Sequence, residues 1–193
     1  LEHPERYAAA RAYLRKHLEA IGGYEITEPV VPGPRGRAHN LVAERRGQSR
    51  PDEIVVIGAH YDSWHTTPGA DDNASGVAAW SGRTPARTLR LVFWATEEPP
   101  AFKRPSMGSL VDASSLRQQD AEVVAMFSLE MLGYYDPKPQ TQHYPPVLAR
   151  FYPGTADFVA FVGRVRGRAE VRCATGRFRQ RAEFPAYGFA GPS

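Results

Sequence analysis

Histidine and carboxylate side chains gather in one short segment, residues 58–76, directly after an apolar run. The segment reads GAHYDSWHTTPGADDNASG and contains His60, Asp62 and Asp72. Imidazole and carboxylate groups suit zinc, manganese or cobalt when thiols are absent, and the chain has a single cysteine, Cys173. The segment therefore predicts a metal site that uses no thiolate cluster.

Further carboxylates follow two other apolar runs. Glu97 and Glu98 come after residues 91–95, and Glu130 comes after residues 122–129. In an open α/β sheet, ligands bind at the carboxyl ends of the strands. We therefore expect these acids to share one rim of a sheet with His60.

The spacing of these residues suggests which of them bind a metal and which orient a ligand or reach a bound water. Asp62 lies two residues after His60, so on an extended segment the two side chains share a face and Asp62 can orient the imidazole. Side chains of consecutive residues diverge, so one of Glu97 and Glu98 can hold a metal while the other reaches its bound water.

Each candidate also has an ordinary structural interpretation. Asp72 fits a turn or a helix N-terminus, and Glu97 with Glu98 fits a solvated pair. Glu130 fits a buried carboxylate paired with an arginine, and His60 alone fits a satisfied core histidine. His65 and His143 lie in loops and are expected to be exposed.

Several other classes of function find no support in the sequence. It contains neither the GxSxG pattern of serine hydrolases nor a glycine-rich phosphate loop. Seven arginines crowd residues 164–181, but no nucleic-acid recognition motif accompanies them, so we expect a solvated helix face and no nucleic-acid partner. No apolar run approaches the roughly 20 residues of a membrane span. Oligomeric state cannot be read from the sequence.

Helical and extended patterns alternate along the 193 residues. Apolar positions recur at three- and four-residue steps over residues 4–21, and helices are also expected at 74–80 and 108–118. Runs rich in β-branched residues predict strands, of which 53–59, 89–95 and 122–129 are interpreted as buried. The expected strands span residues 24–31, 40–45, 53–59, 89–95, 122–129 and 157–163.

This alternation predicts an α/β fold whose central sheet is mixed and mostly parallel. The chain length favours a single domain, residues 1–193.

Five segments together resemble a known family: GAHYDS, PGADDNASGVAA, TLRLVFWATEEP, MGS and SLEMLGYY. In this order and spacing they are similar to the zinc metallopeptidase family that includes bacterial leucyl aminopeptidase, glutamate carboxypeptidase and glutaminyl cyclase. The resemblance covers residues 6–162 and implies the three-layer α/β/α fold of zinc exopeptidases, with a peptide as substrate.

The resemblance also implies roles for individual residues. His60 and Glu130 match ligands of a first metal, Asp72 a carboxylate that bridges two metals, and Glu98 a ligand of the second. Glu97 matches the general base, and Asp62 matches the residue that orients the histidine. A cis peptide bond is implied between Asp72 and Asn73.

Two features depart from the family pattern. The family implies a further histidine ligand after an SDH segment, and the sequence contains neither, so we expect a C-terminally truncated member with a fold incomplete at that end. Two zinc ions are expected in a complete site, and one in this chain if that histidine is lacking. The helix after Gly76 is short, so we expect it to cover the sheet poorly.

The leading hypothesis is an aminopeptidase that hydrolyses N-terminal peptide bonds with a metal-activated water. A single-zinc glutaminyl cyclase and a non-catalytic binding domain of the same fold are the alternatives. Because relatives are often exported, we expect a periplasmic or secreted location.

Overall fold

The computed structural model describes residues 3–33, 36–64, 66–78, 85–145 and 148–192. The chain forms two compact units, Leu1–Gly133 and Tyr134–Ser193. That residues 1–193 make one catalytic domain stays a prediction. Among the described residues, no helix combines the length and apolar character that a bilayer span needs.

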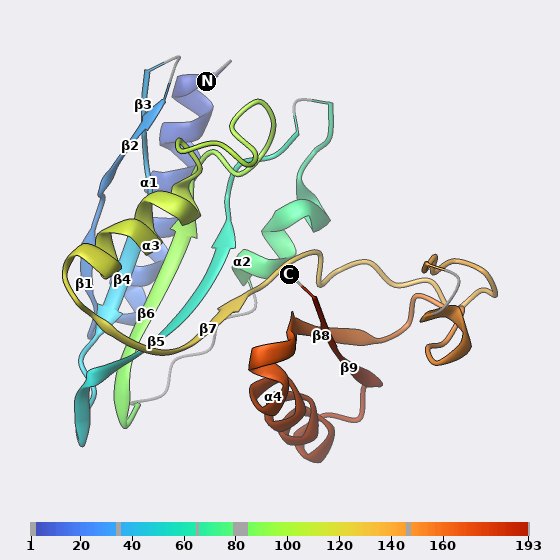
Figure 1. Ribbon diagram of the computed structural model, residues 1–193. Helices are drawn as coiled ribbons and strands as arrows, with labels where there is room; N and C mark the ends of the chain where they lie inside the picture. The colour runs from blue at the N-terminus through green and yellow to red at the C-terminus, as the bar shows by residue number, and fades with distance from the viewer. Residues whose placement is uncertain (1–2, 34–35, 65, 79–84, 146–147, 193) are drawn as a thin grey trace. The chain divides into compact units, whose positions relative to one another are not determined.

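The first unit is built on a five-stranded mixed sheet in the order β1-β4-β6-β5-β7 (Figure 1). β5 runs parallel to both β6 and β7, whereas β4 is antiparallel to β6 and to β1. The predicted mixed sheet with a parallel centre is therefore confirmed. Its strands are β1 (Glu25–Thr27), β4 (Leu41–Arg45), β5 (Arg50–His60), β6 (Arg87–Trp94) and β7 (Glu122–Ser128).

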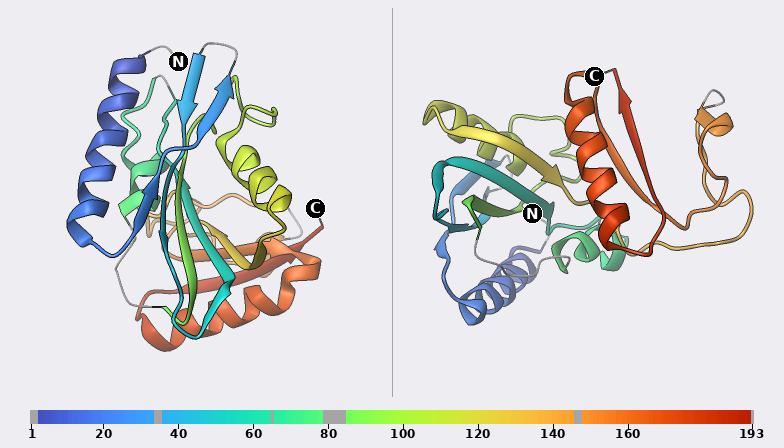
Figure 2. Two further views of the ribbon diagram at one scale, coloured as in Figure 1. Left: turned by 90° about the vertical axis from the view of Figure 1, so that its left-hand side faces the viewer. Right: turned by 90° about the horizontal axis from the view of Figure 1, so that it is seen from below.

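Helices cover both faces of this sheet. Figure 2 shows α1 (Pro4–Ile21) on one side and α3 (Gly108–Gln118) on the other. Side chains of β6 point alternately toward the two helices. Leu91 and Phe93 pack in a cluster with Leu18 of α1, whereas Val92 packs in a second cluster with Leu116 of α3. Burial of both faces explains why the last four residues of β6, 91–94, are all apolar.

Both covering helices have the predicted bounds. Pro4 occupies the first turn of α1, where its missing N–H costs nothing, and Gly22 ends the helix with a left-handed φ of 72°. The apolar face of α1 buries Leu18 against the sheet. These local signals are sufficient to set the bounds.

Three predicted elements differ from the structure. The single strand over 24–31 was wrong: the chain breaks at Pro29 into β1 and β2 (Val30–Gly33), and β2 pairs with β3 (Gly36–His39) in a separate hairpin. Proline lacks the N–H that a continuous strand would need.

β7 is a strand as predicted, but it is not buried. It lies at the edge of the sheet with β5 as its neighbour, and Met126 is 57% exposed. Apolar composition does not determine the position of a strand within a sheet.

The helix predicted over 74–80 is also different. A π-helical turn, η1 (Ala70–Ser75), precedes the short α2 (Gly76–Ala78), and residues 79–80 lie outside the described residues. His65 lies outside them too.

The second unit contains a small parallel sheet. β8 (Val159–Arg164) pairs with β9 (Ala186–Gly191), and the chain crosses between them through η3 (Val165–Gly167) and α4 (Arg168–Arg181). A short 3₁₀ turn, η2 (Leu148–Arg150), precedes β8. The seven arginines of residues 164–181 are all exposed, which agrees with the expected solvated helix face.

Candidate metal centre

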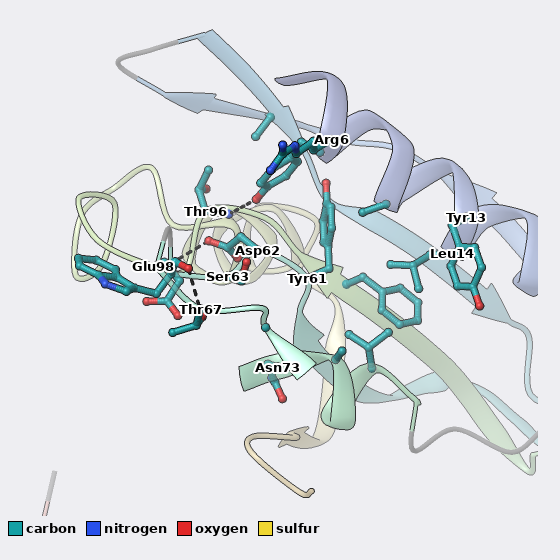
Figure 3. Close-up of a pocket in the computed structure, with 18 of the residues that line it drawn as sticks. Arg6, Tyr13, Leu14, Tyr61, Asp62, Ser63, Thr67, Asn73, Thr96 and Glu98 are labelled. Atoms are coloured by element: carbon teal, nitrogen blue, oxygen red, sulfur yellow. Dashed lines mark hydrogen bonds between the residues drawn. The ribbon is translucent and has the colours of Figure 1, made fainter. Parts of the chain in front are cut away.

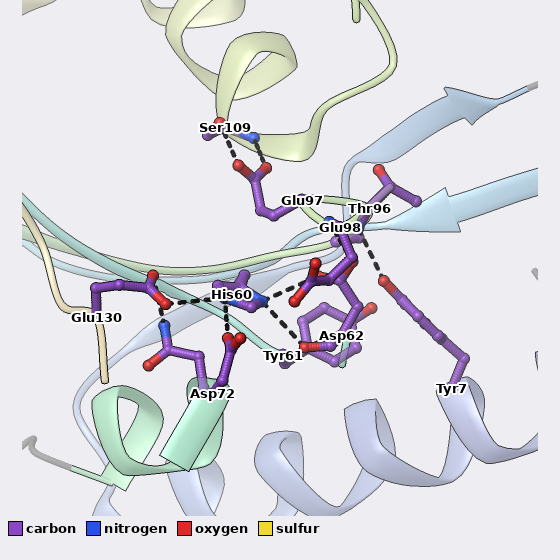
Figure 4. Close-up of polar contacts among 12 residues, drawn as sticks. Tyr7, His60, Tyr61, Asp62, Asp72, Thr96, Glu97, Glu98, Ser109 and Glu130 are labelled. Atoms are coloured by element: carbon purple, nitrogen blue, oxygen red, sulfur yellow. Dashed lines mark hydrogen bonds and ion pairs between the residues drawn. The ribbon is translucent and has the colours of Figure 1, made fainter. Parts of the chain in front are cut away.

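Three side chains from separate segments of the first unit converge at the carboxyl edge of its sheet. His60 is the last residue of β5, Asp72 belongs to η1, and Glu130 follows β7. His60 Nε2 lies 3.1 Å from Asp72 Oδ1 and 3.4 Å from Glu130 Oε1 (Figure 4). One ligand atom from each residue lies within 4.8 Å of the others. The structure thus brings together three of the four predicted metal ligands.

The orientation of His60 is set by Asp62. His60 Nδ1 lies 3.0 Å from the main-chain oxygen of Asp62 and 3.4 Å from its carboxylate Oδ1. The predicted orienting role therefore involves the carbonyl group more closely than the side chain. A proton on Nδ1 that is donated to this carbonyl leaves Nε2 with a lone pair directed at Asp72 and Glu130.

The resulting arrangement fits a divalent cation. Among the described residues, no group donates a hydrogen bond to the buried Oδ1 of Asp72. Burial opposes protonation of His60, but its hydrogen bonds to Asp62 and Glu130 outweigh burial and raise the pKa of the imidazole to about 11. The carboxylates around His60 therefore favour a positive charge at this position, and a metal ion with nitrogen and oxygen ligands can supply it in place of a proton.

Asn73 holds Glu130 in this arrangement, a role that the sequence analysis missed. The Asn73 side chain is fully buried, and its Nδ2 donates to Leu129 O at 2.8 Å and to Glu130 Oε2 at 3.2 Å. Its Oδ1 accepts from Met131 N at 3.2 Å. The peptide bond between Asp72 and Asn73 is cis, which confirms the geometry that the family resemblance implies.

Glu98 lies beside this cluster, although the three-residue group does not include it. Its main-chain N–H donates to Asp62 Oδ2 at 3.0 Å. Burial, and then the negative charge of Asp72, raise the pKa of the Glu98 carboxyl. Glu98 therefore feels the charge of the predicted bridging carboxylate, and its role as a metal ligand stays a prediction.

Glu97 turns the other way, toward α3 (Figure 4). Ser109 donates to both of its carboxylate oxygens, from the main-chain N–H and from Oγ, each at 2.7 Å. Burial raises the pKa of Glu97, and the two hydrogen bonds from Ser109 lower it in part. The predicted divergence of Glu97 and Glu98 is therefore observed, while the general-base role of Glu97 stays a prediction.

A residue of α1 holds the main chain between β6 and these two glutamates. The hydroxyl oxygen of Tyr7 accepts a hydrogen bond from Thr96 N at 2.8 Å, and Thr96 has a left-handed φ of 57°. Burial, and then the charge of Asp62, raise the pKa of Tyr7 well above its ordinary value. A contact between residues so distant in sequence has no local signal.

A cavity of about 1240 Å³ adjoins the centre on the side of Glu98 and Asp62 (Figure 3). α1 contributes Leu14 to its wall, β6 contributes Phe93, and α2 contributes Val77. The cavity is mainly apolar away from the carboxylates. That the short helix after Gly76 covers the sheet poorly stays a prediction.

Comparison with known proteins identifies the family of this chain. The family profile described as Peptidase family M28 matches residues 40–171, which include all the residues of the candidate centre. The chain belongs to peptidase family M28. The resemblance seen in the sequence is thereby confirmed.

Proteins similar in sequence to this chain match different shares of it. "Uncharacterized protein YfbL" of Escherichia coli is 40% identical over 173 residues, which cover 81% of this chain and 52% of that protein. "Carboxypeptidase Q" of Xenopus laevis is 38% identical over 77 residues, or 35% of this chain and 16% of that protein. The M28 chain thus spans about half the length of the Escherichia coli relative.

Solved structures share the fold. The LapA aminopeptidase of Legionella pneumophila matches with a TM-score of 0.65 at 16% identity, over 97% of this chain and 47% of that one. A glutaminyl cyclase from an Acidobacteriales bacterium matches with a TM-score of 0.59 at 15% identity, over 95% of this chain and 64% of that one. At these identities the likeness shows the fold alone.

Proposed function

We propose that this M28 chain carries the catalytic centre of a zinc-dependent exopeptidase that hydrolyses N-terminal peptide bonds. The observation that carries the proposal is the convergence of His60 Nε2, Asp72 Oδ1 and Glu130 Oε1 at one edge of the sheet. Family membership supports a peptide as the substrate.

His60, Asp72 and Glu130 would hold one zinc ion, and Glu98 would help to hold a second. Zinc supplies Lewis acidity toward the scissile carbonyl and the attacking water. We propose two ions for the complete site, as the family resemblance implies.

The chain's own residues would position the proton transfers. Glu97 would accept a proton from the attacking water and pass it to the leaving amine. Each of its oxygens keeps a second lone pair beyond the hydrogen bond from Ser109, so the carboxylate can still accept that proton. Asp62 would hold the imidazole of His60 and the main chain of Glu98 at once.

The charge of the centre favours the amino end of a peptide over its carboxyl end. The carboxylates of Asp62, Asp72, Glu97, Glu98 and Glu130 exceed the charge of two zinc ions, so a net negative charge remains. A free ammonium is attracted to such a site, and a terminal carboxylate is repelled.

The test is the hydrolysis of aminoacyl-nitroanilides by the zinc-loaded protein. Turnover should require a free amino group, and Glu97→Gln should abolish it while zinc content stays the same. Glu122→Gln, at an exposed position on β7, is the matched control and should retain full activity. Retained turnover in Glu97→Gln would refute the role of Glu97.

The same assay separates the alternatives. Hydrolysis only of N-blocked substrates from their carboxyl end would show a carboxypeptidase. Release of ammonia from a glutaminyl peptide without hydrolysis would show a cyclase. Zinc binding without turnover of any of these substrates would support a binding domain.

A further inference from the structure

Ser109 holds both carboxylate oxygens of Glu97. The Ser109 main-chain N–H donates to Oε1 and its Oγ donates to Oε2, each at 2.7 Å. Two donors from one residue fix the plane of the carboxylate as well as its position, which a single hydrogen bond would leave free to rotate.

Ser109 is itself fixed to the end of β6. It is the second residue of α3, so its N–H is one of the helix's first donors, which have no partner within the helix. The first residue, Gly108, donates its N–H to Ala95 O at 2.9 Å. The fully buried Asn40 joins the same two residues, because its Nδ2 donates to Gly108 O at 2.8 Å and its Oδ1 accepts from Ala95 N at 2.9 Å.

The start of α3 has no room to shift. A Cβ added at Gly108 would lie 2.3 Å from Ala95 O and 2.3 Å from Asn40 Oδ1. Buried contacts therefore set the distance between β6 and the donors of Ser109. The main chain that carries these donors is held rigidly, and so is the carboxylate of Glu97. A carboxylate is also favoured at this helix N-terminus, where the helix dipole is positive.

From this geometry we infer that Ser109 is a positioning residue that orients the carboxylate of Glu97 for proton transfer. The inference rests on the proposed function, because it assigns the orientation of the proposed base. The competing explanation is that Glu97 only caps α3. In that case Ser109 would affect stability and leave the turnover of folded protein unchanged.

Steady-state kinetics of the zinc-loaded full chain distinguish the two explanations. Ser109→Ala removes one charge-assisted hydrogen bond and should lower kcat roughly 10- to 100-fold, with KM changed less than about twofold. Ser109→Thr keeps a hydroxyl and should restore kcat to within about threefold of the unaltered protein. Ser114→Ala removes a hydroxyl that donates to Leu110 O on the same helix, and should change neither parameter.

Ser109→Pro extends the series by removing both donors in the first turn of α3, where the Ser109 N–H has no partner within the helix. It should lower kcat further than Ser109→Ala, with the same zinc content. Equal kcat in Ser109→Ala and the unaltered protein would overturn the inference, as would failure of Ser109→Thr to restore it.

A second measurement does not depend on turnover. Urea unfolding of the unaltered protein, Ser109→Ala, Glu97→Ala and the double variant gives the coupling between the two side chains. We expect the coupling to change the folding equilibrium constant about tenfold, and no coupling would overturn the inference. A protein that shows this coupling but no turnover would contradict the proposed function and would still support the interaction of Ser109 with Glu97.

Discussion

Replacing Asn73 with alanine should lower both the stability of the fold and the affinity of the metal centre for zinc. The substitution removes the hydrogen bonds to Leu129 O, Glu130 Oε2 and Met131 N. Neutral hydrogen bonds of this kind contribute about 1 kcal/mol each, and the bond to the carboxylate somewhat more. Because Glu130 is half exposed, that bond belongs near the low end of its range. We expect the free energy of unfolding to fall by about 3 kcal/mol, which is the sum of these three contributions.

The zinc affinity of Asn73→Ala should fall as well. Residues that orient a ligand contribute about 10- to 100-fold to metal affinity when they are removed. Competition against a chromophoric chelator measures the zinc dissociation constant, and urea unfolding measures the stability of the same sample.

Asn40→Ala is the matched control for this experiment. Asn40 is also fully buried and makes two hydrogen bonds to the main chain, but it contacts Ala95 and Gly108 and none of the three converging side chains. It should lower stability by a similar amount and leave zinc affinity within about threefold. Equal zinc affinities in Asn73→Ala and Asn40→Ala would refute the role assigned to Asn73.

Two further predictions concern the sheet. A Cβ at Gly58 would lie 2.2 Å from the ring of Trp94, so Gly58→Ala should lower the free energy of unfolding by about 3 kcal/mol, measured in urea. The buried Asp112 pairs with Arg90 at 2.7 Å, and Asp112→Ala should cost about 2 kcal/mol, because the guanidinium loses this partner and keeps only Glu44 at 3.1 Å. Glu19→Ala, which breaks an exposed pair on α1, should cost under about 0.5 kcal/mol in the same assay, and equal losses would contradict the distinction.

Local patterns in the sequence predicted the elements that carry the centre. β5 and β6 are apolar on both faces because helices cover both, and their ends place His60 and Glu97 at one rim. The periodicity of α1 and the signals at its two ends set its bounds. These features depend on neighbouring residues, so they can be read from the sequence.

The supporting contacts could not be predicted in this way. Asn73 and Glu130 are separated by 57 residues, and Tyr7 and Thr96 by 89. Only the folded chain brings such pairs together. The MGS segment was part of the family resemblance, but nothing in it indicated that Ser109 would hold Glu97.

The edge position of β7 could not be predicted from the sequence for a related reason. Its residues are as apolar as those of a central strand, yet Met126 is mostly exposed. The order of strands depends on connections between distant segments, whereas composition reports only the local preference for an extended chain.

Anomalous X-ray diffraction from zinc-loaded crystals, recorded on both sides of the zinc absorption edge, tests the central claim most directly. We predict a zinc peak bonded to His60 Nε2 at about 2.0 Å, with Asp72 and Glu130 as further ligands. Zinc found only elsewhere on the chain, or a crystal without zinc at these three side chains, would contradict the proposed centre.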